Sequence, residues 1–137
     1  QIIRLLAKAV SLNSNLLLNI GPQCDGSLPE KSLQRLKEIG EWMKVNSESI
    51  KGCGPGPLEE QEWGVTTAPE DNPKVTYLHV FNPNGKTVEL PLKGKIGSVT
   101  ALSDGSAVAW MKVKGKIFVQ LPAKASSGDH VIKVVLK

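Results

Sequence analysis

The feature that most constrains this chain is a short apolar run near its start. Leu16–Ile20 lies between two turn-forming segments, Asn13–Asn15 and Gly21–Pro22. An apolar run of this length predicts a strand buried on both faces, as in a parallel sheet covered by helices. Such a strand needs neighbours for its backbone N–H and C=O groups. We therefore expect this run to be one strand of a larger sheet.

Helical periodicity flanks the run on both sides. Apolar side chains at helical spacing predict a helix over 2–12, and it begins without a capping residue. Ser27 and Glu30 have the spacing of a capping box, in which each side chain bonds the other residue's N–H, and a second helix is expected over 27–46. Residues 1–50 are therefore expected to form helix, buried strand and helix, as a fragment of a larger α/β unit.

The pattern changes in the second half of the chain. Residues 51–73 contain eight Gly or Pro residues and carry a net charge of −4, which predicts an irregular acidic linker. Leu58 and Trp63 are expected to clamp it onto a domain surface. Six short apolar or alternating runs with turn residues between them then predict a small antiparallel β-sandwich over 74–137: 75–81, 87–92, 96–102, 107–113, 117–121 and 130–136. The expected fold class is thus α+β.

Composition restricts the classes of function. The net charge of +4 comes mainly from lysines in 74–137 that flank turns, where lysine keeps strand ends soluble, so we do not expect nucleic-acid binding. No apolar run is long enough for a membrane span. Cys24 and Cys53 lack companions for a zinc site and are expected to be free thiols, although a disulfide between them is conceivable. No cofactor or metal is expected.

Four motifs carry a resemblance to a known family. They keep their spacing over some forty residues: Asn15–Pro22 (NLLLNIGP), Asp25–Glu30 (DGSLPE), Ile39–Trp42 (IGEW) and Asn46–Ile50 (NSESI). The chain resembles the C-terminal part of the α-L-fucosidases of glycoside hydrolase family 29. Two positions depart from the family pattern, with Ser47 in place of glycine and Lys51 in place of tyrosine.

The resemblance implies a catalytic (β/α)8-like barrel followed by a C-terminal β-sandwich. Residues 1–50 would be the last helix–strand–helix of that barrel, 51–73 the linker and 74–137 the sandwich, which supports the barrel. The family hydrolyses terminal α-L-fucose from glycans with retention, which requires a nucleophilic and an acid/base carboxyl group. Both would lie before Gln1, so this chain alone is expected to be inactive. A secreted, periplasmic or lysosomal location is expected from the resemblance alone.

A few residues are candidates for function. Active sites of such barrels form at the C-terminal ends of the strands, so Asn19, Gly21 and Pro22 are expected near the rim of the fucose pocket. Asn19 could instead fix barrel loops.

Other residues have structural explanations beside the functional ones. Asp25 fits an Asp-Gly turn better than a catalytic acid, and His79 and His130 each lack a second metal ligand. Trp63 and Trp110 could stack on a sugar, although Trp110 lies in a run that predicts sandwich core. A carbohydrate-binding or assembly module is the alternative function. We expect the isolated chain to self-associate through its exposed barrel remnant.

Overall fold

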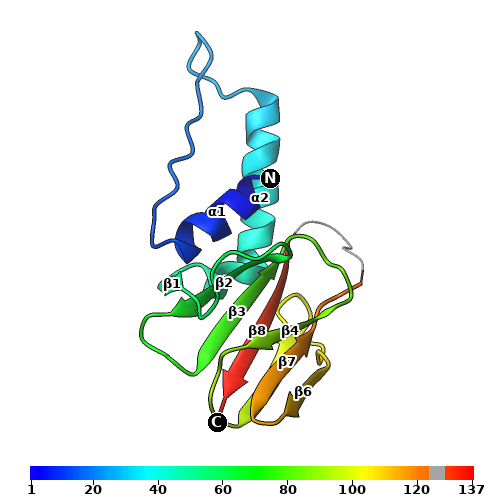
Figure 1. Cartoon of the computed structure of the whole chain (residues 1–137). Coiled ribbons are helices and arrows are strands. Elements are labelled where there is room, and N and C mark those ends of the chain that lie inside the picture. The colour runs from blue at the N-terminus through cyan, green and yellow to red at the C-terminus, as the bar shows by residue number, and fades with distance from the viewer. Residues whose placement is uncertain (124–128) are drawn as a thin grey trace.

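The computed structural model describes residues 1–123 and 129–137, which form an α+β structure with a helical part and a sandwich (Figure 1). The helical part contains α1 (Ile2–Ser11), α2 (Glu30–Asn46) and the 3-10 helix η1 (Ser47–Ser49). The strands follow in chain order: β1 (Cys53–Pro55), β2 (Gly64–Pro69), β3 (Val75–Val80), β4 (Thr87–Leu90), β5 (Ile96–Ala101), β6 (Trp110–Val113), β7 (Lys116–Gln120) and β8 (His130–Leu136).

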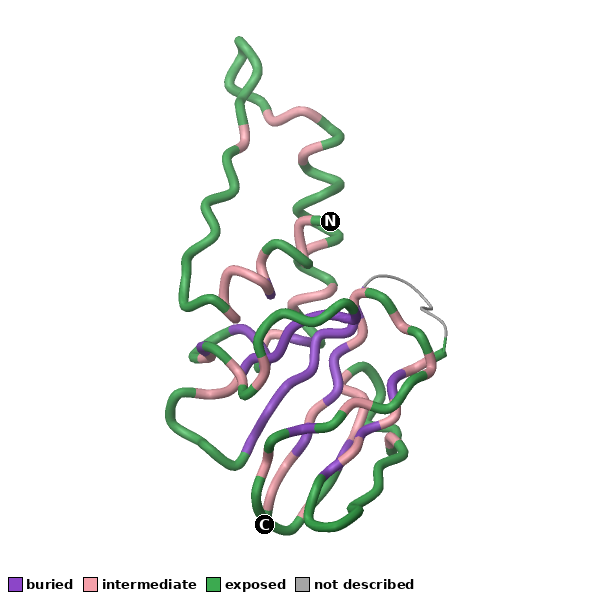
Figure 2. Tube along the Cα trace, in the orientation of Figure 1, coloured by how far each residue is buried: buried purple, intermediate pink, exposed green. Residues whose placement is uncertain are grey.

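The strands form two antiparallel sheets. Sheet A has the order β1-β2-β3-β8-β5, and sheet B has the order β4-β7-β6. Apolar side chains from both sheets form the core between them, and the most deeply buried are Leu78, Val80, Leu90, Ile117, Val119, Leu121 and Val134. The buried residues follow the middle of sheet A (Figure 2). All six strands expected from the sequence are present, with their ends moved by up to three residues.

The expectation of an irregular linker over 51–73 is wrong in two places. Cys53–Pro55 and Gly64–Pro69 are strands, and β2 pairs with β3 in the register Val65 to His79. Glycine and proline mark the ends of these strands, so the composition of the segment concealed them. Leu58 and Trp63 do pack the segment against the sandwich, but Trp63 lies deeper than expected, because it is 6% exposed and belongs to the core between the sheets.

Residues 12–29 form a long excursion away from the sandwich, between α1 and α2 (Figure 1). Leu16–Ile20 pairs with no strand in the described part of the chain, and Leu17 is 91% exposed. The expected capping box is wrong. Helix α2 begins at Glu30 without a side-chain cap, because the Ser27 hydroxyl donates to Asp25 instead, at 2.6 Å.

Gly64 allows β2 to lie close to β3. Its φ is +155°, and a Cβ atom there would collide with the carbonyl oxygen of His79. Gly64→Ala is expected to lower the free energy of unfolding by about 1–3 kcal/mol, because the two strands would have to move apart. Urea denaturation followed by circular dichroism measures the effect.

Gly40→Ala is the matched control. Gly40 is exposed in α2 with open space around it, so alanine should raise the stability by about 0.5–1 kcal/mol. Equal stabilities of Gly64→Ala and the wild-type chain would show that the two strands are not held at this separation.

Candidate functional site

The junction between the helical part and the sandwich contains several buried polar residues, among them Ser49, Thr67 and His79. It forms on the outer face of sheet A, where strand alternation places Val65, Thr67, Tyr77 and His79 on one side. Helix α1 lies over β1 and β2, and Ala7 packs with Val65 and Ile50 in a small apolar cluster. The helical part is thus fixed to the sheet by a face that is separate from the sandwich core.

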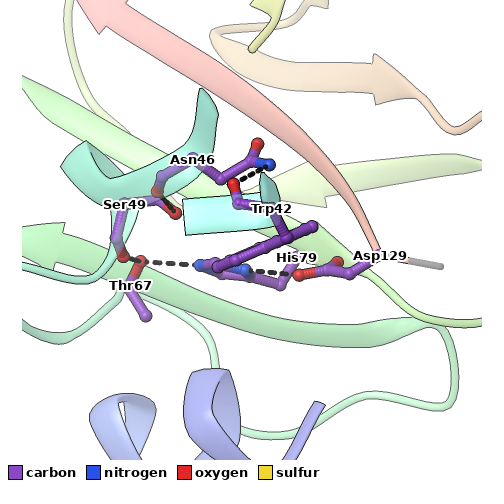
Figure 3. Close-up of polar contacts among 6 residues, drawn as sticks. All are labelled: Trp42, Asn46, Ser49, Thr67, His79 and Asp129. Atoms are coloured by element: carbon purple, nitrogen blue, oxygen red, sulfur yellow. Dashed lines mark hydrogen bonds and ion pairs between the residues drawn. The ribbon is translucent and has the colours of Figure 1, made fainter. Parts of the chain in front are cut away.

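A buried chain of hydrogen bonds crosses this junction (Figure 3). The Nδ1 atom of His79 lies 2.9 Å from Oδ2 of Asp129, and its Nε2 atom lies 3.1 Å from Oγ1 of Thr67. The Thr67 hydroxyl donates to the carbonyl oxygen of Ser49 at 2.8 Å. The side chains of His79 and Asp129 have no exposed surface. The network therefore ties the region before β8 through β3 and β2 to η1.

The strand register explains why these side chains meet. Thr67 and His79 lie diagonally across the β2–β3 pair, since Thr67 is opposite Tyr77 and Val65 is opposite His79. Asp129 precedes β8, whose Val131 is also opposite His79. Asp129 is 62 residues from Thr67 in the sequence, so only the sheet brings them together. No motif in the sequence indicated this network.

The end of α2 closes the junction. The Trp42 ring lies 6.4 Å from the His79 ring, centre to centre, and its Nε1 atom is buried without a hydrogen-bond partner. Asn46 donates to the carbonyl of Trp42 at 3.0 Å, and the Ser49 hydroxyl donates to the carbonyl of Asn46 at 2.7 Å. These side-chain bonds connect the last turn of α2 to η1.

Charged residues surround the buried network. Lys133 pairs with Glu48 at 2.9 Å, and Arg4 donates to the carbonyl of Phe81 at 2.6 Å. Burial, reinforced by the negative charge of Glu48, raises the pKa of Tyr77 well above its ordinary value. Burial likewise raises the pKa of the Cys53 thiol to about 11. Both groups therefore stay neutral at physiological pH.

Thr67, His79 and Asp129 have the residue types of a nucleophile–base–acid triad. Their geometry does not support that role. Thr67 is fully buried, and its hydroxyl already donates to the Ser49 carbonyl, so no substrate can reach it. The network is structural, which confirms the expectation for His79.

The expected rim residues lie on the excursion. Asn19, Gly21 and Pro22 are exposed, far along the chain from the buried network. Leu18, Asn19 and Ile20 line a shallow pocket together with Ile2 of α1 and Leu36 of α2. Whether these residues face a sugar stays a prediction.

Asp25 forms the expected turn. Its Oδ1 atom accepts from the Ser27 hydroxyl and from Ser27 N–H, at 2.6 and 2.9 Å. These two hydrogen bonds, that of the hydroxyl first, lower the pKa of Asp25. Asp25 therefore stays ionised and is not a proton donor near neutral pH.

The two tryptophans do not form one sugar-binding face. Trp63 is buried, whereas Trp110 is 42% exposed on β6. The prediction that Trp110 belongs to the core is wrong, because β6 is an edge strand of sheet B. Trp110 shares the inner side with its partner Val119, but no further strand covers it there.

Other candidate groups are isolated from one another. In residues 1–123 and 129–137, no three His, Cys, Asp or Glu side chains lie close enough together to hold a metal ion. Cys24 and Cys53 are free thiols, as expected. No helix among the described residues combines the length and the apolar character needed to cross a membrane.

Comparison with known proteins confirms the resemblance found in the sequence. The family model for α-L-fucosidase matches residues 1–48. An α-L-fucosidase of Branchiostoma floridae is 32% identical over 131 residues, which cover 93% of this chain and 29% of the relative. The chain is thus related to α-L-fucosidases over nearly its whole length, and it spans about three tenths of theirs.

Solved structures give the same result. α-L-Fucosidase isoenzyme 1 from Paenibacillus thiaminolyticus matches 100% of this chain and 34% of its own, with 32% identity and a TM-score of 0.82. A Bacteroides thetaiotaomicron α-L-fucosidase of glycoside hydrolase family 29, solved as a trapped covalent intermediate with 2-fluoro-fucosyl fluoride, matches 97% of this chain and 31% of its own, with 25% identity and a TM-score of 0.80.

The buried pair is expected to dominate the stability of the junction. Asp129→Ala should lower the free energy of unfolding by about 3–5 kcal/mol, because His79 would lose its partner inside the protein. The control is Glu89→Ala, which breaks an exposed pair with Lys116 and should cost less than about 1 kcal/mol. Thermal and urea unfolding measure both. Similar small losses in the two variants would contradict a structural role for the network.

Proposed function

We propose that this chain, a relative of the α-L-fucosidases, is the C-terminal part of a retaining exo-α-L-fucosidase that removes terminal α-L-fucose from glycans. The relatives by sequence and by structure support this function. In the proposal, residues 1–50 complete a catalytic (β/α)8-like barrel, and the sandwich supports that barrel. In the proposal the barrel binds the substrate, so fucosylated glycans are partners of the whole protein and not of this chain alone.

One observation carries the proposal. Leu16–Ile20 is extended, apolar and without a strand partner in the described chain, and Leu17 is almost fully exposed. Water is a poor environment for such a segment, because its apolar side chains remain exposed, and its backbone groups find no strand partner in the described chain. Nevertheless, the whole chain superposes on a fucosidase about three times its length. The excursion therefore has a shape that suits the inside of a larger fold.

The same reasoning places the rim of the pocket. If Leu16–Ile20 is a strand of the barrel, then Asn19, Gly21 and Pro22 are at its C-terminal end, where barrel active sites form. Retention requires two carboxyl groups about 5 Å apart, one of which must carry a proton. Asp25 in the adjacent loop is held ionised by Ser27 and does not supply that proton. We infer from the family resemblance that the catalytic pair belongs to the part of the parent protein that this chain does not cover.

The junction explains how the sandwich would act as a support. Its contacts reach α2 at Trp42 and Asn46 and reach α1 at Ala7. Because α2 begins eight residues after Pro22, we infer that fixing the end of α2 fixes one side of the barrel. The sandwich thereby contributes to the site without contacting the sugar.

Catalysis separates the parent from the isolated chain. The purified 137-residue chain is expected to release no fucose from an aryl α-L-fucoside, whereas the longer parent hydrolyses it. The rate is measured from the absorbance of the aryl alcohol that is released together with fucose. Fucosidase activity that stays with the isolated chain through several purification columns would overturn the proposal that the catalytic residues lie outside this chain.

Self-association tests the exposed segment. The isolated chain is expected to form dimers or larger species, because exposed apolar strands recruit partners. Leu17→Glu should shift the population toward monomer in light scattering at high concentration. Val113→Glu is the control, since Val113 is also exposed but lies on β6. A monomeric wild-type chain would contradict the proposal, and dissociation by Val113→Glu alone would place the interface on sheet B.

A further inference from the structure

The single proton of the Thr67 hydroxyl determines the direction of the buried network. Thr67 Oγ1 contacts two groups, the Ser49 carbonyl at 2.8 Å and His79 Nε2 at 3.1 Å. A carbonyl only accepts, and a hydroxyl has one proton to donate. Among the described backbone and side-chain bonds, Thr67 is the only donor to the Ser49 carbonyl. The proton of Thr67 therefore goes to Ser49, and Thr67 accepts a proton from Nε2 of His79.

The other side of the ring then needs a second proton. Nδ1 of His79 lies 2.9 Å from Oδ2 of Asp129, which is hydrogen-bond distance. With Nε2 already protonated, this bond forms only if a further proton sits on Nδ1 or on the carboxyl oxygen. The pair then holds one proton more than a neutral imidazole beside a carboxylate. Its net charge is zero in either arrangement.

The competing arrangement leaves more groups unsatisfied. If Thr67 donated to Nε2, the buried Ser49 carbonyl would lose its donor, and His79 would donate through Nδ1 to a charged Asp129. The pair would then carry a net negative charge with both side chains fully buried. The second oxygen of Asp129 is buried without a partner, and no Lys or Arg of the described residues pairs with Asp129. Among the contacts of the described residues, a net charge on this buried pair has no compensation, which is costly, so the neutral pair is favoured.

We propose that His79 and Asp129 share an additional proton and that His79 is a positioning residue, which passes a directed hydrogen-bond chain through Thr67 to the Ser49 carbonyl. The chain holds η1, and with it the C-terminal end of α2, in one orientation on sheet A. This inference rests on contacts within the chain and does not depend on the proposed function.

The shape of the molecule makes this orientation consequential. Helix α2 contacts the sheet side of the molecule near Trp42, Met43 and Asn46, while its N-terminal half projects away from the sandwich (Figure 1). A helix of 17 residues is about 25 Å long. A rotation of about 10° at its base therefore moves its far end by roughly 4 Å. The bond from Thr67 to Ser49 sits at that base.

Nitrogen NMR of the ring tests the protonation directly. The chain is labelled with ¹⁵N-histidine, and the His79 signals are assigned by their loss in His79→Gln, with His130 as the internal reference. Near neutral pH, Nε2 of His79 is expected to be protonated and hydrogen-bonded. A His79 ring that carries its only proton on Nδ1, beside an ionised Asp129, would overturn the proposal.

Hydrogen exchange tests the positioning role. Thr67→Val removes the hydroxyl and keeps the side-chain shape, whereas Thr67→Ser keeps the hydroxyl. Thr67→Val is expected to speed amide exchange at least several-fold in 47–51 and in the last turn of α2, while the amides of β3 exchange as in the wild type. Thr67→Ser is expected to leave exchange in all of these regions as in the wild type. Unchanged exchange in 47–51 of Thr67→Val would refute the role. If Thr67→Val does not fold, two measurements still test the proposal. One is the ring protonation of His79. The other is amide exchange in Thr67→Ser, where faster exchange in 47–51 would also refute the positioning role.

Discussion

Strand β3 is buried at all six of its positions, and the rest of the structure follows from the need to cover both of its faces. Leu78 and Val80 face sheet B, while Tyr77 and His79 face the helical part. A strand buried on both faces requires a layer on each side. The sandwich supplies one layer, and α1, η1 and the end of α2 supply the other. The two parts of the molecule are therefore joined through the outer face of sheet A, to which β2 and β3 both contribute, rather than through a flexible connection.

The two faces are covered by different chemistry. Between the sheets the contacts are apolar, and such contacts tolerate small shifts because they have no preferred direction. The outer face combines a small apolar cluster with the hydrogen bonds among Ser49, Thr67, His79 and Asp129. Hydrogen bonds are directional, and breaking one inside a protein is costly. This difference suits a junction that must hold the helices at one angle.

The excursion from 12 to 29 has the opposite character. Four of its leucines, at positions 12, 16, 17 and 18, are exposed, and Leu16–Ile20 pairs with no strand of the described chain. The same overall shape nevertheless occurs in a fucosidase about three times as long. A firmly bonded junction together with an exposed, unpaired apolar segment is what a piece of a larger protein would present. Under the proposed function, the junction sets the angle of α2, and the barrel covers the exposed leucines. The sandwich would then influence the sugar pocket through geometry alone.

The sequence by itself determined the elements whose signals are local. Six strands were predicted from alternating runs and turn residues, both helices from apolar periodicity, and the family from the motifs between Asn15 and Ile50, because each of these signals lies within a short stretch. Only the tertiary structure decided what depends on distant partners. Strand β2 forms because Gly64 lets it approach β3, and Trp110 is exposed because β6 is an edge. Thr67 is connected to Asp129 through His79 only because β2, β3 and β8 lie side by side. Pairing and burial of this kind depend on residues far apart in the sequence, and a local pattern does not contain them.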